Sequence, residues 1–89
     1  MSTFIKDPDA NLDYKVDWSS WLPDGDTIAS AQWIVPDELT AGQQTNDDTS
    51  ATVWLSGGTA RQRVQVTCRI TTTQGRVDDR SFTLIVRDR

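Results

Sequence analysis

The chain of 89 residues contains no histidine and only one cysteine, Cys68. Without histidine, the commonest general base and the commonest zinc ligand are both missing, which argues against metal-dependent hydrolases. A single thiol forms no disulfide framework and is ordinary in a reducing compartment. Cys68 lies on the apolar side of the most regular strand pattern, where thiols are buried and inert. We therefore expect no enzymatic activity, no cofactor and no metal site.

Long apolar runs and an excess of basic residues are also missing. No window approaches 18 apolar residues, and the N-terminal sequence lacks the basic start and apolar run of a signal peptide. Nine lysine and arginine residues are outnumbered by 13 aspartate and glutamate residues, which gives a net charge of −4. This balance disfavours nucleic acid and anionic membranes as partners. We expect a single domain that is made and kept in the cytosol.

Paired aspartates are the remaining candidates for metal binding or acid catalysis. None of the pairs shows the twelve-residue spacing of an EF-hand loop. Most of them lie beside turns, where aspartate is favoured because it hydrogen-bonds its own backbone. We therefore interpret them as solvated turn residues, and the pairs are Asp7 and Asp9, Asp24 and Asp26, Asp47 and Asp48, and Asp78 and Asp79.

What the sequence does contain is a set of short segments in which apolar and polar residues alternate, the pattern of half-buried strands. Turn residues separate these segments, and no run has helical periodicity. The pattern favours an all-β fold, an immunoglobulin-like β-sandwich of about six short antiparallel strands. The predicted strands are residues 11–18, 27–35, a short edge piece at 39–41, 49–56, 63–73 and 77–86.

Three segments carry more specific expectations. Pro8 blocks a helix and favours an extended backbone, so residues 1–10 are predicted to form an N-terminal arm on a single domain of residues 11–89. In the first strand Leu12 is expected to face inward. In the second, Trp33 is expected inward, with Ile28 on the opposite side. Residues 42–48 are predicted to form a polar loop.

Four tryptophans in so short a chain need an explanation. Trp18 and Trp33 fall on inward faces and are assigned to the core. Trp21 and Trp54 lie outside the inward alternation, and exposed tryptophan is typical of protein interfaces and of stacking platforms for sugars. The alternative is that both cover the ends of the sandwich. The candidate partner contacts are Asp7, Asp9, Trp21, Leu22 and Trp54.

Three blocks of the sequence, read together, resemble a known family. They are DPDANLDYKVDWSSWL, GDTIASAQWIVP and VWLSGGTARQRVQVTCRITTTQGRVDDRSFTLIVRD. This combination, from about Ile5 to the C-terminus, is similar to the phage fibre-to-tail adaptor proteins, small structural proteins of tailed bacteriophages. Residues 37–50 are the variable part.

The resemblance implies a non-enzymatic virion protein, made in the host cytoplasm, that joins or decorates tail, neck or head components. Its implied partners are other phage structural proteins of the tail, neck, fibre or capsid, bound in multiple copies. Two alternatives stay open. One is a capsid decoration protein that clamps major capsid subunits, and the other is a glycan-binding module that contacts the host surface through an exposed tryptophan. Deletion of residues 1–10 is expected to spare folding and to abolish assembly.

Overall fold

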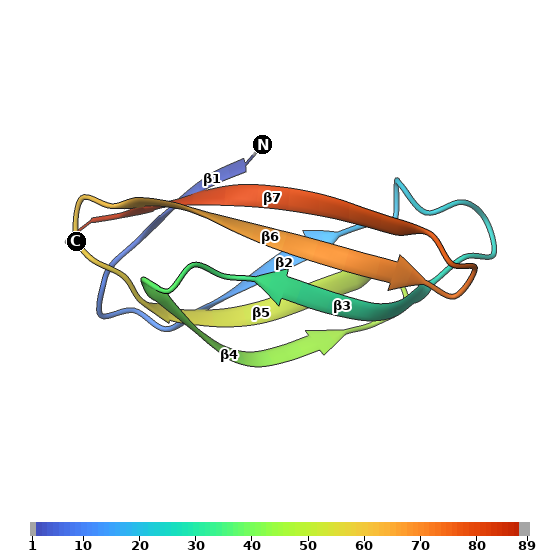
Figure 1. Cartoon of the computed structure of the whole chain (residues 1–89), viewed down its shortest axis with the longest axis horizontal. Coiled ribbons are helices and arrows are strands. Elements are labelled where there is room, and N and C mark those ends of the chain that lie inside the picture. Colours follow the sequence, from blue (N-terminus) through green and yellow to red (C-terminus); the bar gives the residue numbers. More distant parts are fainter. Residues whose placement is uncertain (1, 88–89) are drawn as a thin grey trace.

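The computed structural model describes residues 2–87 and contains seven strands in two sheets (Figure 1). The alternation of apolar and polar residues seen in the sequence accounts for most of them. The strands are β1 (Ser2–Lys6), β2 (Leu12–Asp17), β3 (Ile28–Ile34), β4 (Leu39–Asn46), β5 (Ser50–Gly57), β6 (Arg63–Thr72) and β7 (Val77–Val86).

One sheet has the strand order β1-β7-β6-β3 and the other the order β2-β5-β4. Every pairing is antiparallel except that of β1 with β7, which is parallel. The predicted all-β fold is confirmed. The separation of β2, β5 and β4 from β3, β6 and β7 is compatible with an immunoglobulin-like sandwich.

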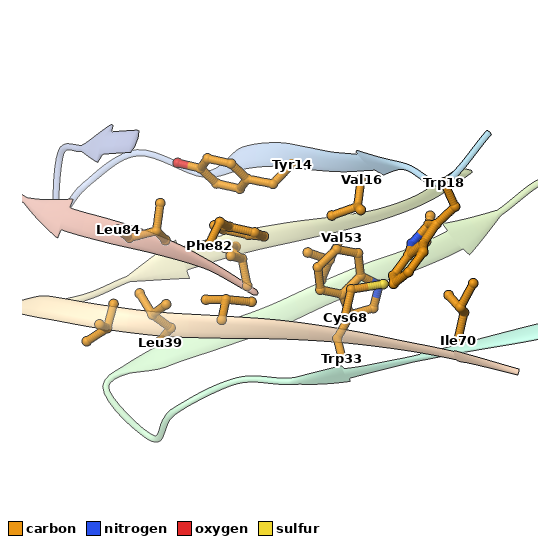
Figure 2. Packing of buried hydrophobic residues seen from close by; sticks show 14 of the residues in the cluster. Tyr14, Val16, Trp18, Trp33, Leu39, Val53, Cys68, Ile70, Phe82 and Leu84 are labelled. Atoms are coloured by element: carbon orange, nitrogen blue, oxygen red, sulfur yellow. The ribbon is translucent and has the colours of Figure 1, made fainter. Parts of the chain in front are cut away.

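The core lies between the two sheets and is built from the inward residues of the predicted strands (Figure 2). Trp18 is fully buried and Trp33 is 8% exposed, so both predictions for these tryptophans are confirmed. Cys68 is also fully buried, and Figure 2 shows the Trp18 ring beside its sulfur. Burial raises the pKa of the Cys68 thiol to about 11, which keeps it protonated and unreactive.

The predicted N-terminal arm is extended, but its first half is part of a sheet. Residues Ser2–Lys6 form β1 and pair in register with Phe82–Val86 of β7. The Phe4 ring lies 5.6 Å from that of Tyr14 and 5.5 Å from that of Phe82. The backbone of residues 2–6 is therefore built into the sandwich.

Two expectations about which strand residues are buried differ from the structure. Leu12 lies opposite the buried Leu55 and so is on the inward face, but at the start of the edge strand β2 it is 40% exposed. Ile28 is only 5% exposed although Trp33 is buried too. The register of β3 against β6 shifts between Ile28 and Ser30, and this β-bulge turns Ile28 into the core.

The predicted polar loop after residue 41 is also wrong. The strand β4 continues to Asn46, with a register shift between Ala41 and Gln44. Only Leu39 of this strand is buried. Both faces of β4 therefore meet solvent, which explains why its sequence lacks the alternation typical of a strand.

Buried charges tie the sandwich together at both ends. At one end, the fully buried Lys6 ammonium donates to the carbonyl oxygens of Asp7 (2.9 Å) and Gly57 (2.7 Å) and so links β1 to β5 of the other sheet. At the other end, the Asp26 side chain has no exposed surface. It joins the β2–β3 loop to the turn between β6 and β7, which Figure 1 shows at the same end of the molecule.

Candidate functional site

The first pair of candidate contacts, Asp7 and Asp9, lies in the connection between β1 and β2. The Asp7 side chain accepts a hydrogen bond from the Asp9 backbone N–H at 2.8 Å, and the Ala10 N–H donates to the Asp7 carbonyl oxygen at 3.0 Å. This is an Asx-type turn, the ordinary use of aspartate at such a position. Asp9 is exposed. Its role as a partner contact stays a prediction, as does that of Asp7.

The second pair, Trp21 and Leu22, lies in the loop after β2. Both backbone N–H groups donate to the Trp18 carbonyl oxygen at 3.0 Å, which folds the chain back in a helical turn. The Trp21 ring packs edge-to-face on that of Trp18, with ring centres 5.4 Å apart. Both side chains are partly buried against the core. The alternative considered for Trp21, that it covers one end of the sandwich, agrees with this packing.

Trp54 lies on the outer face of the three-stranded sheet and is 38% exposed. It projects from the central strand β5, directly opposite Asp13 on β2. On its other side, β4 presents Gly42, whose backbone approaches so closely that an added Cβ would stand 3.5 Å from the Trp54 Cβ. The indole is therefore partly exposed on the outer face of this sheet.

The five predicted contacts do not form one site. Asp7 and Asp9 precede β2 and the Trp21–Leu22 corner follows it, so the length of this strand separates them. Trp54 belongs to a sheet face rather than to either end. Each contact remains a prediction.

A cleft that the sequence did not reveal lies on the flank of the sandwich between β7 and β2. It has a volume of about 140 Å³. Its lining residues come from β1, β2 and β7, and they are Phe4, Lys15, Val16, Asp17, Arg80, Ser81 and Phe82.

Arg80 crosses this flank. Its guanidinium lies 4.6 Å from the centre of the Trp18 ring and donates a hydrogen bond to the Asp17 carbonyl oxygen at 2.8 Å. Arg80 pairs with the buried Cys68, so it occupies a position that faces inward. A sequence signal existed: charged residues at positions 78 and 80 interrupt the inward apolar series that Phe82, Leu84 and Val86 continue. Inward charged residues on a strand mark a place where the sandwich is not closed.

Within residues 2–87, no three histidine, cysteine, aspartate or glutamate side chains come close enough to hold a metal ion. A search of the same residues finds no helix that is long and apolar enough to span a membrane.

Comparison with known protein families gives one match. A family model described as podophage GP4 fiber-tail adaptor protein gp77 aligns with residues 6–85 of the 89. The chain belongs to the podophage fiber-tail adaptor family. A search of curated proteins finds no match.

Membership of the fiber-tail adaptor family confirms the resemblance inferred from the three sequence blocks. The matched region begins at Lys6, inside β1, and ends at Ile85, inside β7. It therefore spans both sheets. This protein is accordingly a structural protein of the phage tail adaptor class.

Proposed function

We propose that this chain is a non-enzymatic component of the virion that joins a fibre to the tail by binding other phage structural proteins. The observation that supports the proposal most strongly is the match to the fiber-tail adaptor family over both sheets of the sandwich. The adaptor is made in the host cytoplasm and is incorporated into particles in several copies, so that weak contacts add up through avidity.

The chemistry of the chain agrees with a binding role. It has no histidine, and its one thiol is fully buried and protonated. Exposed apolar side chains instead occur on separate surfaces: Phe4 and Ile5 on β1, Ile34 on β3 and Trp54 on β5. Exposed aromatic and aliphatic side chains of this kind act as contact points in protein interfaces.

Mass spectrometry of purified virions tests the proposal. The chain should be present in intact particles and should remain with the tail when heads and tails are separated. Absence from intact particles would refute the proposal. A copy number on the order of ten would agree with a place on the tail axis, whereas hundreds of copies in the head fraction would favour a capsid decoration protein.

The exposed Trp54 supports one other candidate function, a glycan-binding module that contacts the host surface. A partly exposed indole on an outer sheet face is a suitable platform for stacking a sugar ring. The candidate predicts that host-surface polysaccharide quenches tryptophan fluorescence of the wild-type chain but not of a Trp54→Ala variant. No quenching of the wild-type fluorescence across a broad sugar panel would eliminate it.

A further inference from the structure

Half of the outer edge of β7 carries no neighbouring strand in the part of the chain that the structure describes. Strand β1 pairs with residues Phe82–Val86, whereas Val77–Ser81 extend beyond the first paired residue, Ser2. On its other side β7 pairs with β6 from Val77 to Ile85 without a register shift. The open half of the edge is therefore a regular strand with one side unpaired.

The hydrogen bonds fix which backbone groups face this open edge. The Val86 N–H donates to the Gln62 carbonyl oxygen on the β6 side. The Arg87 N–H donates to the Lys6 carbonyl oxygen on the β1 side. Because successive residues of a strand point their backbone groups to opposite sides, the odd-numbered residues face β1. The groups of Val77, Asp79 and Ser81 therefore point outward.

A side-chain contact supports this assignment independently. The Asp79 N–H donates to the carboxylate of its neighbour Asp78 at 2.9 Å, a bond that an N–H directed at β6 would not form. No backbone group of Val77–Ser81 takes part in the backbone hydrogen bonds that residues 2–87 form outside the strand ladders. The open edge is thus capped by a side chain that an incoming strand can displace.

The edges of β3, β4 and β2 are less suited to accept a strand. Both β3 and β4 contain register shifts, and such bulges disrupt the regular spacing of edge groups. The edge of β2 is regular, but Arg80 already occupies its last carbonyl group, that of Asp17. The open half of β7, in contrast, is regular, and a strand added there would continue the position that β1 occupies in the sheet.

The side chains along this edge define what the added strand should carry. Arg80 and Asp78 occupy the inward face, and the cleft beside Arg80 is lined partly by the apolar side chains of Phe4, Val16 and Phe82 and partly by polar ones. Asp78 forms no ion pair within residues 2–87. Residues directly opposite each other in a sheet share a face. In an added strand, the residues opposite Arg80 and Asp78 therefore lie two positions apart on the inward face. The first should be apolar to enter the cleft, and the second should be basic to pair with Asp78.

We infer that the open edge Val77–Ser81 binds an extended segment of a neighbouring virion protein, which adds a strand to the sheet in line with β1. The segment places an apolar side chain in the flank cleft and a basic side chain, two residues away, beside Asp78. Main-chain hydrogen bonds to Val77, Asp79 and Ser81 hold it, as in other cases of strand addition. The inference rests on the proposed function, because it takes the partner from the same particle.

The test complements phage that lack this gene with plasmid-borne variants and measures how much of each variant purified particles contain. Val77→Pro removes an outward N–H at the first residue of the strand, a position that tolerates proline, and Asp78→Lys reverses the edge charge. The double variant should be incorporated at least tenfold less than the wild type. Asp24→Lys, which makes the same charge change at an exposed loop position, should be incorporated normally.

Hydrogen exchange of the wild-type chain gives a second measurement that does not depend on a variant folding. Peptides that cover residues 77–81 should exchange at least tenfold more slowly in particles than in the free protein, while β4 peptides should change less. Normal incorporation of the double variant, or unchanged exchange at residues 77–81 in particles, would overturn the inference and leave the adaptor function intact. Absence of the wild-type chain from particles would instead overturn the proposed function, and the inference with it.

Discussion

The two ends of the sandwich are tied by buried charges of opposite sign. At one end the Lys6 ammonium donates to two backbone carbonyl oxygens. At the other end the Asp26 carboxylate accepts hydrogen bonds from the turn between β6 and β7 and from the backbone N–H of Thr27. The Lys6 end links the two sheets through β1, whereas the Asp26 end links two connecting segments. The first should therefore matter more to the stability of the whole fold.

Removal of β1 should have the largest effect. A chain without residues 1–6 loses the pairing along Phe82–Val86, the Phe4 ring contacts and the Lys6 hydrogen bonds. We expect the free energy of unfolding to fall by at least about 3 kcal/mol, from unsatisfied carbonyls and lost aromatic contacts. Guanidinium unfolding monitored by tryptophan fluorescence measures this. An unchanged midpoint would restore the interpretation of these residues as a dispensable arm.

The Lys6 side chain alone should account for part of that loss. Lys6→Met keeps the apolar stem but leaves the Gly57 and Asp7 carbonyls without their donor, at a cost of about 1–3 kcal/mol. The matched control is Lys15→Met, which changes the net charge equally at an exposed position and should leave stability within about 0.5 kcal/mol. Equal unfolding curves for the two variants would show that the buried ammonium contributes nothing to the fold.

The Asp26 end should show its effect through pH. Burial raises the pKa of Asp26, but the hydrogen bonds that its carboxylate accepts outweigh burial and hold the pKa below 3.8. A lowered carboxyl pKa gives stability that is present above the unfolded value and is lost as the pH falls through the folded value. Asp26→Asn should therefore lower the Tm by a few degrees at neutral pH, and the difference should shrink below about pH 4.

A series of thermal melts from pH 2 to 7 measures this, with Asp24→Asn as the exposed control. A difference in Tm between wild type and Asp26→Asn that stays constant down to pH 2 would contradict the lowered pKa of Asp26.

The pKa of Lys6 is also shifted. Burial lowers it, against the opposing effect of Asp7 and Asp9. Between the lowered folded pKa and the unfolded value of 10.5, the folded state binds fewer protons than the unfolded state, so in that pH range this group makes stability rise with pH.

The smallest effect on stability is expected for Trp54, which lies on a sheet face between the two ends. Trp54→Ala should cost less than the loss of a buried tryptophan, because the residue is 38% exposed. The same change at the buried Trp18 should cost about 3–5 kcal/mol. Virion incorporation of the Trp54 variant then tests the predicted contact without a folding defect. A stable variant that is incorporated normally would remove Trp54 from the candidate contacts.

The alternation of apolar and polar residues predicted most of the fold, because within a strand it indicates which side is buried. The series that contains Val66 and Cys68 identified β6, and the two core tryptophans followed from the same rule. Ile28 was placed on the wrong side because a β-bulge interrupts the two-residue alternation within β3, and no residue type in this segment indicates the bulge. The end of β4 was missed because a strand exposed on both faces has no apolar period.

Local sequence patterns could not predict that β1 pairs with β7. Residues 2–6 join Phe82–Val86 at the far end of the chain, and parallel pairing between such distant segments leaves no turn in the sequence. The candidate contacts show the same limit. Trp54 could be recognised as outward-facing from its own strand, whereas the flank cleft needs β1, β2 and β7 in place at once.

Cys68 has a practical consequence beyond its place in the core. It is the only thiol of the chain, it is fully buried, and its pKa of about 11 keeps the reactive thiolate scarce at neutral pH. A thiol reagent can reach it only when the two sheets separate, so the labelling rate reports how often the sandwich opens. The labelling rate of Cys68 can therefore report opening without an engineered cysteine, in the free protein and in the assembled particle alike.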